Sequence, residues 1–165
     1  MKTIPLTKGK VALVDDADFE WLNQHKWHAI QPNPPHGSFY AARRDMAQSE
    51  RYVYMHNVIL GVLGVDHRDS NGLNNQRSNL RPASPRENAS HQRLQHRKKG
   101  GFKGVSRPAI ATGMSHLWFA YINHKGKRRY LGYFVNATDA ARAYDAKAIE
   151  LFGEFALTNA QMGLL

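Results

Sequence analysis

The chain contains no cysteine, so it can form neither a disulfide framework nor a zinc site with thiolate ligands. Any metal ion here must therefore be held by oxygen and imidazole ligands. Long apolar runs are also absent, and spanning a bilayer takes about 18 or more such residues. The first residues lack the apolar stretch of a signal peptide. We therefore expect a cytoplasmic protein with no membrane partner.

Acidic residues are scarce, with 13 Asp and Glu against 23 Lys and Arg, which gives a formal net charge of +10. In a short chain such an excess indicates a polyanionic partner, nucleic acid first and anionic membrane second. A merely soluble basic protein is the alternative. With 165 residues, 42% of them hydrophobic, the chain can form one ordinary domain or two small ones with modest cores.

Residues 1–62 have the pattern of a scaffold. Asp16 or Asp18 could cap a short helix that carries Phe19, Trp21 and Leu22. A proline-rich loop is expected at 32–37 and a buried helical turn at 55–60. β-Branched and aromatic residues predict short strands at 10–14, 27–30, 39–43 and 51–54.

A strand, a long polar loop, a second strand and a helix are predicted in succession between residues 64 and 96. Asp66-His67 ends the first strand. The helix start is marked three times: Ser84 can cap it, Pro85 suits its first position, and Glu87 closes a capping box. The end of the first strand and the first helical turn should therefore lie close together.

Two oxygen-bearing side chains, Asp66 and Asn88, occupy these neighbouring positions. Their oxygens suit Mg²⁺ or Mn²⁺, with phosphate oxygens and water completing an octahedral shell. His67 points to the opposite side of the strand, where a neutral imidazole can take a proton from an attacking water. The cation would neutralise the scissile phosphate and stabilise the leaving 3′ oxygen. Singly, these could be ordinary loop and helix residues, but their ordered spacing favours a nuclease.

The motif resembles that of HNH endonucleases, in the phage and intron-encoded branch whose last position is asparagine. The matching pieces are Val65-Asp66-His67-Arg68-Asp69, Asn74-Asn75, Ser78-Asn79-Leu80-Arg81 and Glu87-Asn88. The resemblance implies a ββα-metal finger with His67 and Asn79 as catalytic residues. Asn79 would hold the loop and orient His67 through its amide.

The resemblance extends from His56 to His91, and the roles of these two histidines stay open. His56 matches a family position and could be structural or could support the active site. His91 could be a third metal ligand, a phosphate contact or a bystander. Many HNH proteins brace the finger with a four-cysteine zinc site. This chain has no cysteine, so we expect no structural zinc and assign that support to residues 1–62.

The stretch from residue 92 to residue 99 is rich in Arg, Lys and His and is followed by Gly100-Gly101. We place a linker at 97–101, between a nuclease domain at 1–96, whose finger is 64–96, and a second domain at 102–159. Arg97, Lys98 and Lys99 are expected to contact phosphates, which adds salt-sensitive affinity without sequence information. A solvated run of charge is the alternative.

The second domain reads as three strands and one helix. The strands are expected at 103–107, 116–123 and 127–134, and the helix at 136–152, with Asn136 as its cap and Gly153 as its stop. Period-two alternation places Trp118, Ala120, Ile122 and Leu131 on the face toward the helix. The open face, suited to the major groove, then carries Phe119, Tyr121, Asn123, Arg128 and Tyr130.

These residues resemble the AP2/ERF DNA-binding domain. The matching pieces are Phe102-Lys103-Gly104-Val105, Trp118-Phe119-Ala120-Tyr121-Ile122, Tyr130-Leu131-Gly132-Tyr133-Phe134, the helix from Ala137 to Asp145, and Phe152-Gly153 with Ala156-Leu157-Thr158-Asn159. The resemblance implies that the open face reads DNA through Lys103, Tyr121, Asn123, Arg128 and Tyr130. Solvated sheet residues are the alternative. Ser106 and an insert at 109–114 depart from the family pattern, so its target sequence does not transfer.

Together the halves predict an α+β protein: an HNH finger on a β-rich scaffold, then a three-stranded antiparallel sheet with one covering helix. We expect a Mg²⁺- or Mn²⁺-dependent, homing-type endonuclease that acts on double-stranded DNA. It would act as a monomer or homodimer in the cytoplasm of a bacterial or phage-infected cell. The alternatives are a non-cleaving AP2-type transcription regulator and a structure-specific nuclease that acts on branched DNA.

Overall fold

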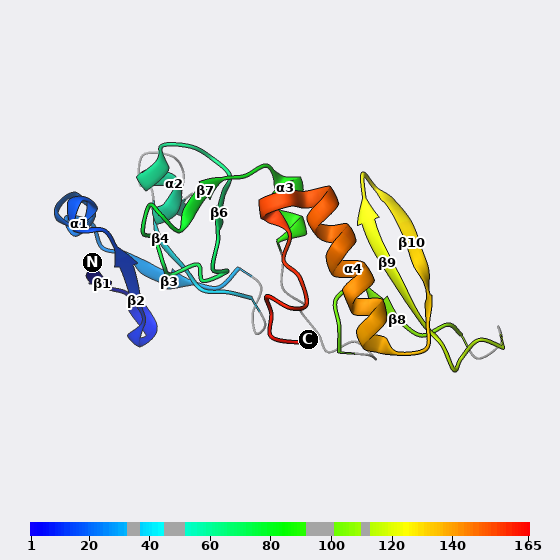
Figure 1. The fold of residues 1–165 in the computed structure, drawn as a ribbon. Helices are drawn as coiled ribbons and strands as arrows, with labels where there is room; N and C mark the ends of the chain where they lie inside the picture. The colour runs from blue at the N-terminus through cyan, green and yellow to red at the C-terminus, as the bar shows by residue number, and fades with distance from the viewer. Residues whose placement is uncertain (33–36, 45–51, 92–100, 110–112) are drawn as a thin grey trace. The chain divides into compact units, whose positions relative to one another are not determined.

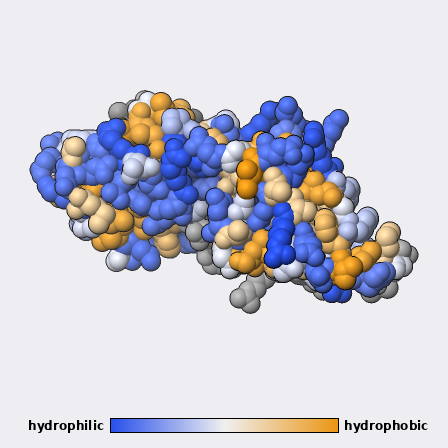
Figure 2. Space-filling view, in the orientation of Figure 1, coloured by the Kyte–Doolittle hydropathy of each residue, from blue (hydrophilic) through white to orange (hydrophobic). Residues whose placement is uncertain are grey.

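A computed structural model describes residues 1–32, 37–44, 52–91, 101–109 and 113–165 of the chain (Figure 1). The chain divides into two compact units, residues 1–88 and 89–165. Both are mixed α+β structures with small antiparallel sheets. The visible surface is largely hydrophilic, with scattered hydrophobic patches (Figure 2). Within the described ranges, no helix combines the length and the apolar character needed to cross a membrane.

The first unit is built from three small sheets and short helices. β1 (Lys2–Pro5) and β2 (Val11–Val14) form one hairpin, and α1 (Asp16–Leu22) follows it. β3 (His28–Ile30), β4 (Tyr40–Arg44) and β5 (Tyr52–Tyr54) form an antiparallel sheet in chain order. After α2 (Met55–Leu60) come β6 (Val65–His67), its antiparallel partner β7 (Leu80–Pro82) and α3 (Pro85–Ser90).

Most local predictions for this unit are confirmed. The helical turn at 55–60 is α2, and the strands expected at 10–14, 27–30 and 39–43 are β2, β3 and β4 within a residue at each end. β1 was not predicted. The cap prediction for α1 is wrong, because the helix is preceded by Asp15, which makes no side-chain cap bond. Its carboxylate instead accepts from the backbone N–H of Arg77 at 2.8 Å.

One hydrophobic core joins nearly all elements of the first unit. Trp27 is its largest fully buried side chain, and the indole N–H donates to the carbonyl of Leu22 at 2.8 Å, which satisfies its polar atom. Because β6 and β7 contribute to this core, the finger is packed on the scaffold. The other buried members are Ile4, Ala12, Val14, Leu22, Ala41, Met55, Ile59, Val65 and Leu80.

The second unit is a three-stranded antiparallel sheet covered on one face by a long helix (Figure 1). β9 (Trp118–His124) lies between β10 (Lys127–Phe134) and β8 (Val105–Ser106). The helix α4 (Ala137–Phe152) ends at Gly153, whose φ is 53°. The predicted third strand and helix are confirmed. Ala120 and Ile122 are buried against α4, and Leu131 packs on the same side, as alternation predicts.

The first strand of this sheet is shorter than predicted for a local reason. Gly104 has φ +73°, and a Cβ there would collide with the Tyr144 ring of α4. The backbone N–H of Lys103 donates to Asn159 at 2.6 Å rather than to a neighbouring strand. Asn159 is fully buried and also binds the Asp145 carboxylate at 2.8 Å. The chain therefore enters the sheet only at Val105.

The boundary between the units lies earlier than the predicted end of the first domain at residue 96. Ser90, the last residue of α3, belongs to the second unit through two contacts. Its carbonyl accepts from the Lys103 ammonium at 2.9 Å, and its hydroxyl donates to the carbonyl of Phe155 at 3.4 Å. Most of the predicted linker, including Arg97, Lys98 and Lys99, lies outside the described residues.

Candidate active site

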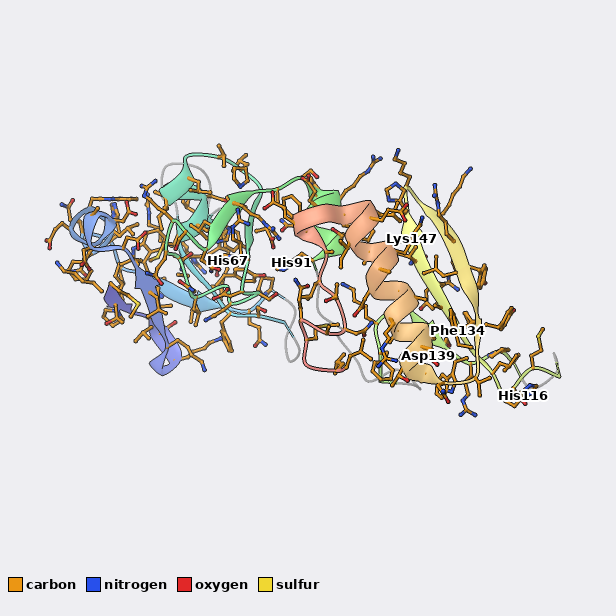
Figure 3. The ribbon with its side chains drawn as sticks, viewed as in Figure 1. His67, His91, His116, Phe134, Asp139 and Lys147 are labelled. Atoms are coloured by element: carbon orange, nitrogen blue, oxygen red, sulfur yellow. The ribbon has the colours of Figure 1, made fainter. Side chains whose placement is uncertain are left out.

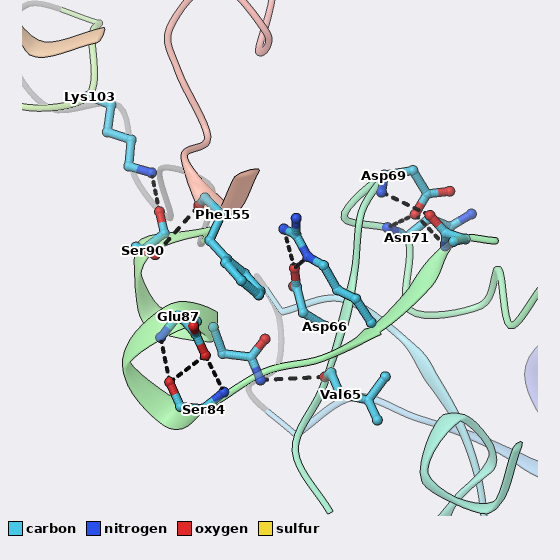
Figure 4. Close-up of polar contacts among 12 residues, drawn as sticks. Val65, Asp66, Asp69, Asn71, Ser84, Glu87, Ser90, Lys103 and Phe155 are labelled. Carbon is cyan, nitrogen blue, oxygen red and sulfur yellow. Dashed lines mark hydrogen bonds and ion pairs between the residues drawn. The ribbon is translucent and has the colours of Figure 1, made fainter. Parts of the chain in front are cut away.

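The β6–β7 hairpin presents the Asp66-His67 pair, and both side chains are buried. Asp66 lies opposite Arg81 in the register of the two strands. The Arg81 guanidinium donates to Asp66 Oδ2 from Nε at 2.8 Å and from Nη2 at 2.6 Å (Figure 4). Two charge-assisted bonds from a buried cation fix the rotamer of Asp66.

The predicted capping box at the start of α3 is confirmed (Figure 4). The backbone N–H of Ser84 donates to the Glu87 carboxylate at 2.7 Å, and that of Glu87 donates to the Ser84 hydroxyl at 3.3 Å. Hydrogen bonds from Ser84 lower the pKa of Glu87. This start brings Asn88 beside β6, where its amide donates to the carbonyl of Val65 at 3.4 Å. Asn88 thus lies against the peptide that precedes Asp66.

The donor set of Asp66 and Asn88 fits a hard cation. One carboxylate and one amide oxygen come from adjacent segments, and the described residues contain no cluster of three His, Cys, Asp or Glu able to hold a metal ion. Zinc needs more protein ligands than this. Mg²⁺ is commonly held by one or two protein oxygens and keeps water and phosphate in its remaining positions.

Asn79 closes the loop between β6 and β7. Its amide donates to Asp69 Oδ1 at 3.0 Å and to the carbonyl of Asn74 at 2.8 Å, while its oxygen accepts from the Asp69 N–H at 3.0 Å. These contacts hold the loop, and the orienting role predicted for Asn79 stays a prediction. The Asn75 side chain also reaches His67, since its Oδ1 lies 3.4 Å from His67 Nε2.

Asn75 is a residue that sequence reasoning quoted but gave no role. It is fully buried, and its backbone N–H donates to the carbonyl of Leu13 of β2 at 2.8 Å, so its main chain is held by the scaffold. Only its place in the motif marked it in the sequence. In the structure it supplies the oxygen that can orient the His67 ring.

Two rings from residues 1–62 contact the His67 imidazole, which Figure 3 labels in the first unit, and a third stacks behind them. His56 of α2 meets it edge to face at 4.9 Å between ring centres, and Tyr40 of β4 lies at 5.9 Å. Tyr54 of β5 stacks on His56 at 5.3 Å. Neither tyrosine was predicted as a site residue. The sequence marked them only by their positions in two predicted strands. We call Tyr40, Tyr54 and His56 the ring cage.

The ring cage is a weakly solvated environment. Burial, and to a smaller extent the neighbouring His67, lowers the pKa of His56 to about 3, so His56 is neutral at ordinary pH. Burial also raises the pKa of Tyr40, and the Asp66 carboxylate adds to this. His56 Nδ1 is buried without a hydrogen-bond partner among the described residues. His56 therefore contacts His67 as an uncharged ring.

His91, the other histidine left open, follows α3 and belongs to the second unit. Figure 3 labels it, and the residue is buried, with 6% of it exposed. The three roles considered for it stay predictions.

The N-terminal elements hold the loop between β6 and β7 directly. Loop residue Leu73 accepts from the N–H of Leu13 at 2.8 Å, which adds a bridge to the edge of β2. Arg77 donates to both oxygens of Asp18, at 2.8 and 2.7 Å, and Asp18 is 3% exposed. Residues 1–62 thus contact the loop directly.

The chain is similar to a viral HNH endonuclease. That protein, named "Uncharacterized HNH endonuclease L560", comes from Acanthamoeba polyphaga mimivirus and is 27% identical over 157 residues. The match covers 92% of this chain and 76% of the viral protein, so it extends through both units. It supports an HNH nuclease family for this chain. No protein-family profile and no solved structure matches the chain.

The second unit carries an aromatic and basic surface on the sheet face away from α4. Four of the predicted DNA contacts lie on this face, since Asn123 pairs with Arg128 and Tyr121 with Tyr130 across the strands. The Arg128 guanidinium lies 4.4 Å from the centre of the Tyr121 ring. Tyr130 is 64% exposed. We call Tyr121, Asn123, Arg128 and Tyr130 the open face.

Lys103 was predicted to contact DNA, but its ammonium points into its own unit. It donates to the carbonyls of Ser90 at 2.9 Å and Leu157 at 3.1 Å. Burial lowers its pKa to about 8, against the opposing effect of Asp145. These contacts give Lys103 a structural role, and we do not count it in the open face.

Proposed function

We propose that this protein is a divalent-metal-dependent endonuclease that hydrolyses phosphodiester bonds of double-stranded DNA. The observation that carries the proposal is the end of β6, where Asp66 is ion-paired, His67 lies in contact with Asn75 and the ring cage, and Asn88 packs on the same strand. The similarity to a viral HNH endonuclease agrees with it.

Asp66 and Asn88 would hold Mg²⁺ or Mn²⁺, which supplies charge neutralisation at the scissile phosphate and at the leaving 3′ oxygen. His67 acts as the general base. With its Nε2–H donating to Asn75 Oδ1, the neutral ring carries its lone pair on Nδ1, which accepts the proton of the attacking water. The ring cage limits rotation of the imidazole and keeps bulk water from its faces.

The second unit supplies DNA recognition of the homing type. Its open face offers an amide, a guanidinium and two phenols, groups that can donate to base edges in the major groove. Arg97, Lys98 and Lys99 would add phosphate contacts, and the net charge of +10 favours association with DNA. In this proposal the second unit selects a site and the first unit cuts it.

The test is cleavage of a large, varied DNA with mapping of the product ends. His67→Ala should reduce the cleavage rate about 10²–10⁴-fold, the usual effect of losing a general base, with little change in DNA affinity. His25→Ala, an exposed histidine, is the matched control and should cut normally. EDTA should stop cleavage, and Mg²⁺ or Mn²⁺ should restore it.

Three outcomes would replace parts of this proposal. Near-normal cutting by His67→Ala would end its assignment as the base, and full activity in EDTA would end the metal assignment. DNA binding without any cleavage would favour a transcription regulator. Preference for branched DNA, with no preferred linear sequence, would favour a structure-specific nuclease.

A further inference from the structure

The sheet that forms part of the ring cage continues beyond it on the same face. In β3, β4 and β5, residues paired across the strands point to the same side, and successive residues alternate. Ala29 pairs with Ala41, and both are buried, so this side faces the core. The opposite side carries Tyr40 and Tyr54 of the ring cage. Side chains two residues apart in a strand point to the same side. The opposite side therefore also carries His28 of β3, Arg44 of β4 and Tyr52 of β5.

These three residues line a hollow of about 570 Å³, together with Lys8 and with residues 29–31, in and directly after the edge strand β3. Arg44 and Lys8 are exposed, and Tyr52 is 46% exposed. No acidic side chain is among the described residues that line it. A guanidinium, an ammonium, an imidazole and a phenol are hydrogen-bond donors suited to phosphate oxygens.

The structure builds Lys8 into this position. It lies in the turn Thr7–Gly9 with φ 60°, a left-handed conformation that is uncommon outside glycine. The turn is tied to the sheet because the backbone N–H of Ala29 donates to the Thr7 hydroxyl at 3.0 Å. Lys8 is therefore presented at the edge of β3 by a fixed turn rather than by a loose loop.

We propose that this hollow binds backbone phosphates of the DNA strand next to the cutting site. The inference rests on the proposed function and extends it, because it makes the scaffold a DNA-binding surface as well as a support. Two features favour DNA as the occupant: the hollow is basic, and it shares a sheet face with Tyr40, whose ring contacts His67.

Distance fits this assignment. Tyr52 and Tyr54 are two residues apart in β5, which is about 7 Å along a strand. Tyr54 is linked to His67 through the stacked His56 ring. Because DNA advances about 3.4 Å per nucleotide along its axis, the phosphates held here should lie within about five nucleotides of the cut.

The first experiment measures DNA affinity as a function of salt, in a His67→Ala background so that the duplex stays intact. Each phosphate contact contributes about 0.9 to the slope of log affinity against log salt, so K8Q/R44Q should lower the slope by about 1.8. The control K2Q/K147Q removes the same charge from lysines that already pair with Glu20 and Glu150, and should change the slope little. An equal change in both double variants would overturn the inference.

The second experiment locates the phosphates. Neutral methylphosphonates are placed one at a time on either side of the mapped cut, and binding is measured again. Positions within about five nucleotides should weaken binding of the protein with Lys8 and Arg44, and should have no further effect on K8Q/R44Q. If the losses from the methylphosphonate and from K8Q/R44Q added at every position, the inference would be overturned. Chemical acylation of Lys8 gives a further check: the inference also fails if neither inorganic phosphate nor DNA protects Lys8 from it.

Thermal melting checks that the variants fold, and K8N/R44Q serves if K8Q/R44Q does not, because asparagine tolerates the left-handed turn. The proposed function and this inference fail in different ways. If the wild-type protein cuts DNA and K8Q/R44Q keeps the same salt slope, the proposed function stands and phosphate binding in the hollow is refuted. If the wild-type protein never cuts DNA but K8Q/R44Q lowers the salt slope, phosphate binding stands and the proposed function is refuted.

Discussion

The buried ion pair between Asp66 and Arg81 allows a prediction that links stability to metal binding. Both side chains are at most 9% exposed, and two bonds of 2.6 and 2.8 Å converge on one carboxylate oxygen. Arg81→Met keeps most of the side chain's length and removes the charge. The Asp66 carboxylate would then be buried without its cation, and breaking a buried pair in this way costs about 3–5 kcal/mol.

The assay is unfolding of the full chain, by heat and by urea, without divalent ions. For a unit of this size a loss of 1 kcal/mol lowers Tm by about 4–8 °C, so Arg81→Met should melt at least about 12 °C lower. Mg²⁺ should then restore stability, because a cation bound to Asp66 replaces the missing charge. At 100 times its Kd a ligand adds about 2.7 kcal/mol.

The double variant Asp66→Asn/Arg81→Met is the matched control, since it removes both charges together. It should be more stable than Arg81→Met alone and should show no response to Mg²⁺. If Arg81→Met melted with the wild-type protein, the buried pair would not have the strength argued here. If it were destabilised but indifferent to Mg²⁺, Asp66 would not be a metal ligand.

Further predictions follow from the ring cage and the second unit. The pKa of His56 is about 3 in the folded protein against 6.5 ordinarily, so the unfolded chain takes up the extra proton and stability falls as pH drops below about 6.5. Between pH 7 and 4.5, His56→Phe should lose roughly 2–3 kcal/mol less than wild type in urea unfolding, and equal losses would contradict this. Arg128→Ala should weaken preference for one DNA site by about 1–3 kcal/mol in competition binding, with Arg129→Ala, paired to the buried Ile122, as control. Equal loss on random DNA would make Arg128 a phosphate contact. Asn159→Ala should destabilise the second unit by about 2–4 kcal/mol in thermal melting, because it removes buried bonds to Lys103 and Asp145, and an unchanged Tm would refute that.

Local sequence signals predicted the helices and strands well where the residues that begin or end an element lie within it or next to it. The capping box at Ser84 and Glu87 needs only residues within one turn, and it forms as expected. The stop of α4 at Gly153 likewise depends on one positive φ. The faces of β9 follow from alternation alone, which is why Ala120 and Ile122 are buried.

Contacts between distant parts of the chain could not be predicted in this way. Arg77 binds Asp18 across 59 residues, and nothing near either residue marks the other. The ring cage combines α2, β4 and β5 beside a histidine on β6, so it exists only after two sheets and a helix have packed. Lys103 shows the opposite error, because a position aligned with a DNA contact is turned inward by the carbonyls that surround it.

The sequence contains no cysteine, and we predicted that residues 1–62 support the segment after β6. A zinc site would stabilise such a segment through ligands of its own, independently of the rest of the unit. Here the loop that holds Asn75 is fixed by hydrogen bonds to Leu13 and by the Asp18 carboxylate, both from the N-terminal hairpin and helix. The orientation of His67 therefore depends on β2 and α1 being folded. Mutations in those elements should reduce cleavage even though they lie far from His67 in the sequence.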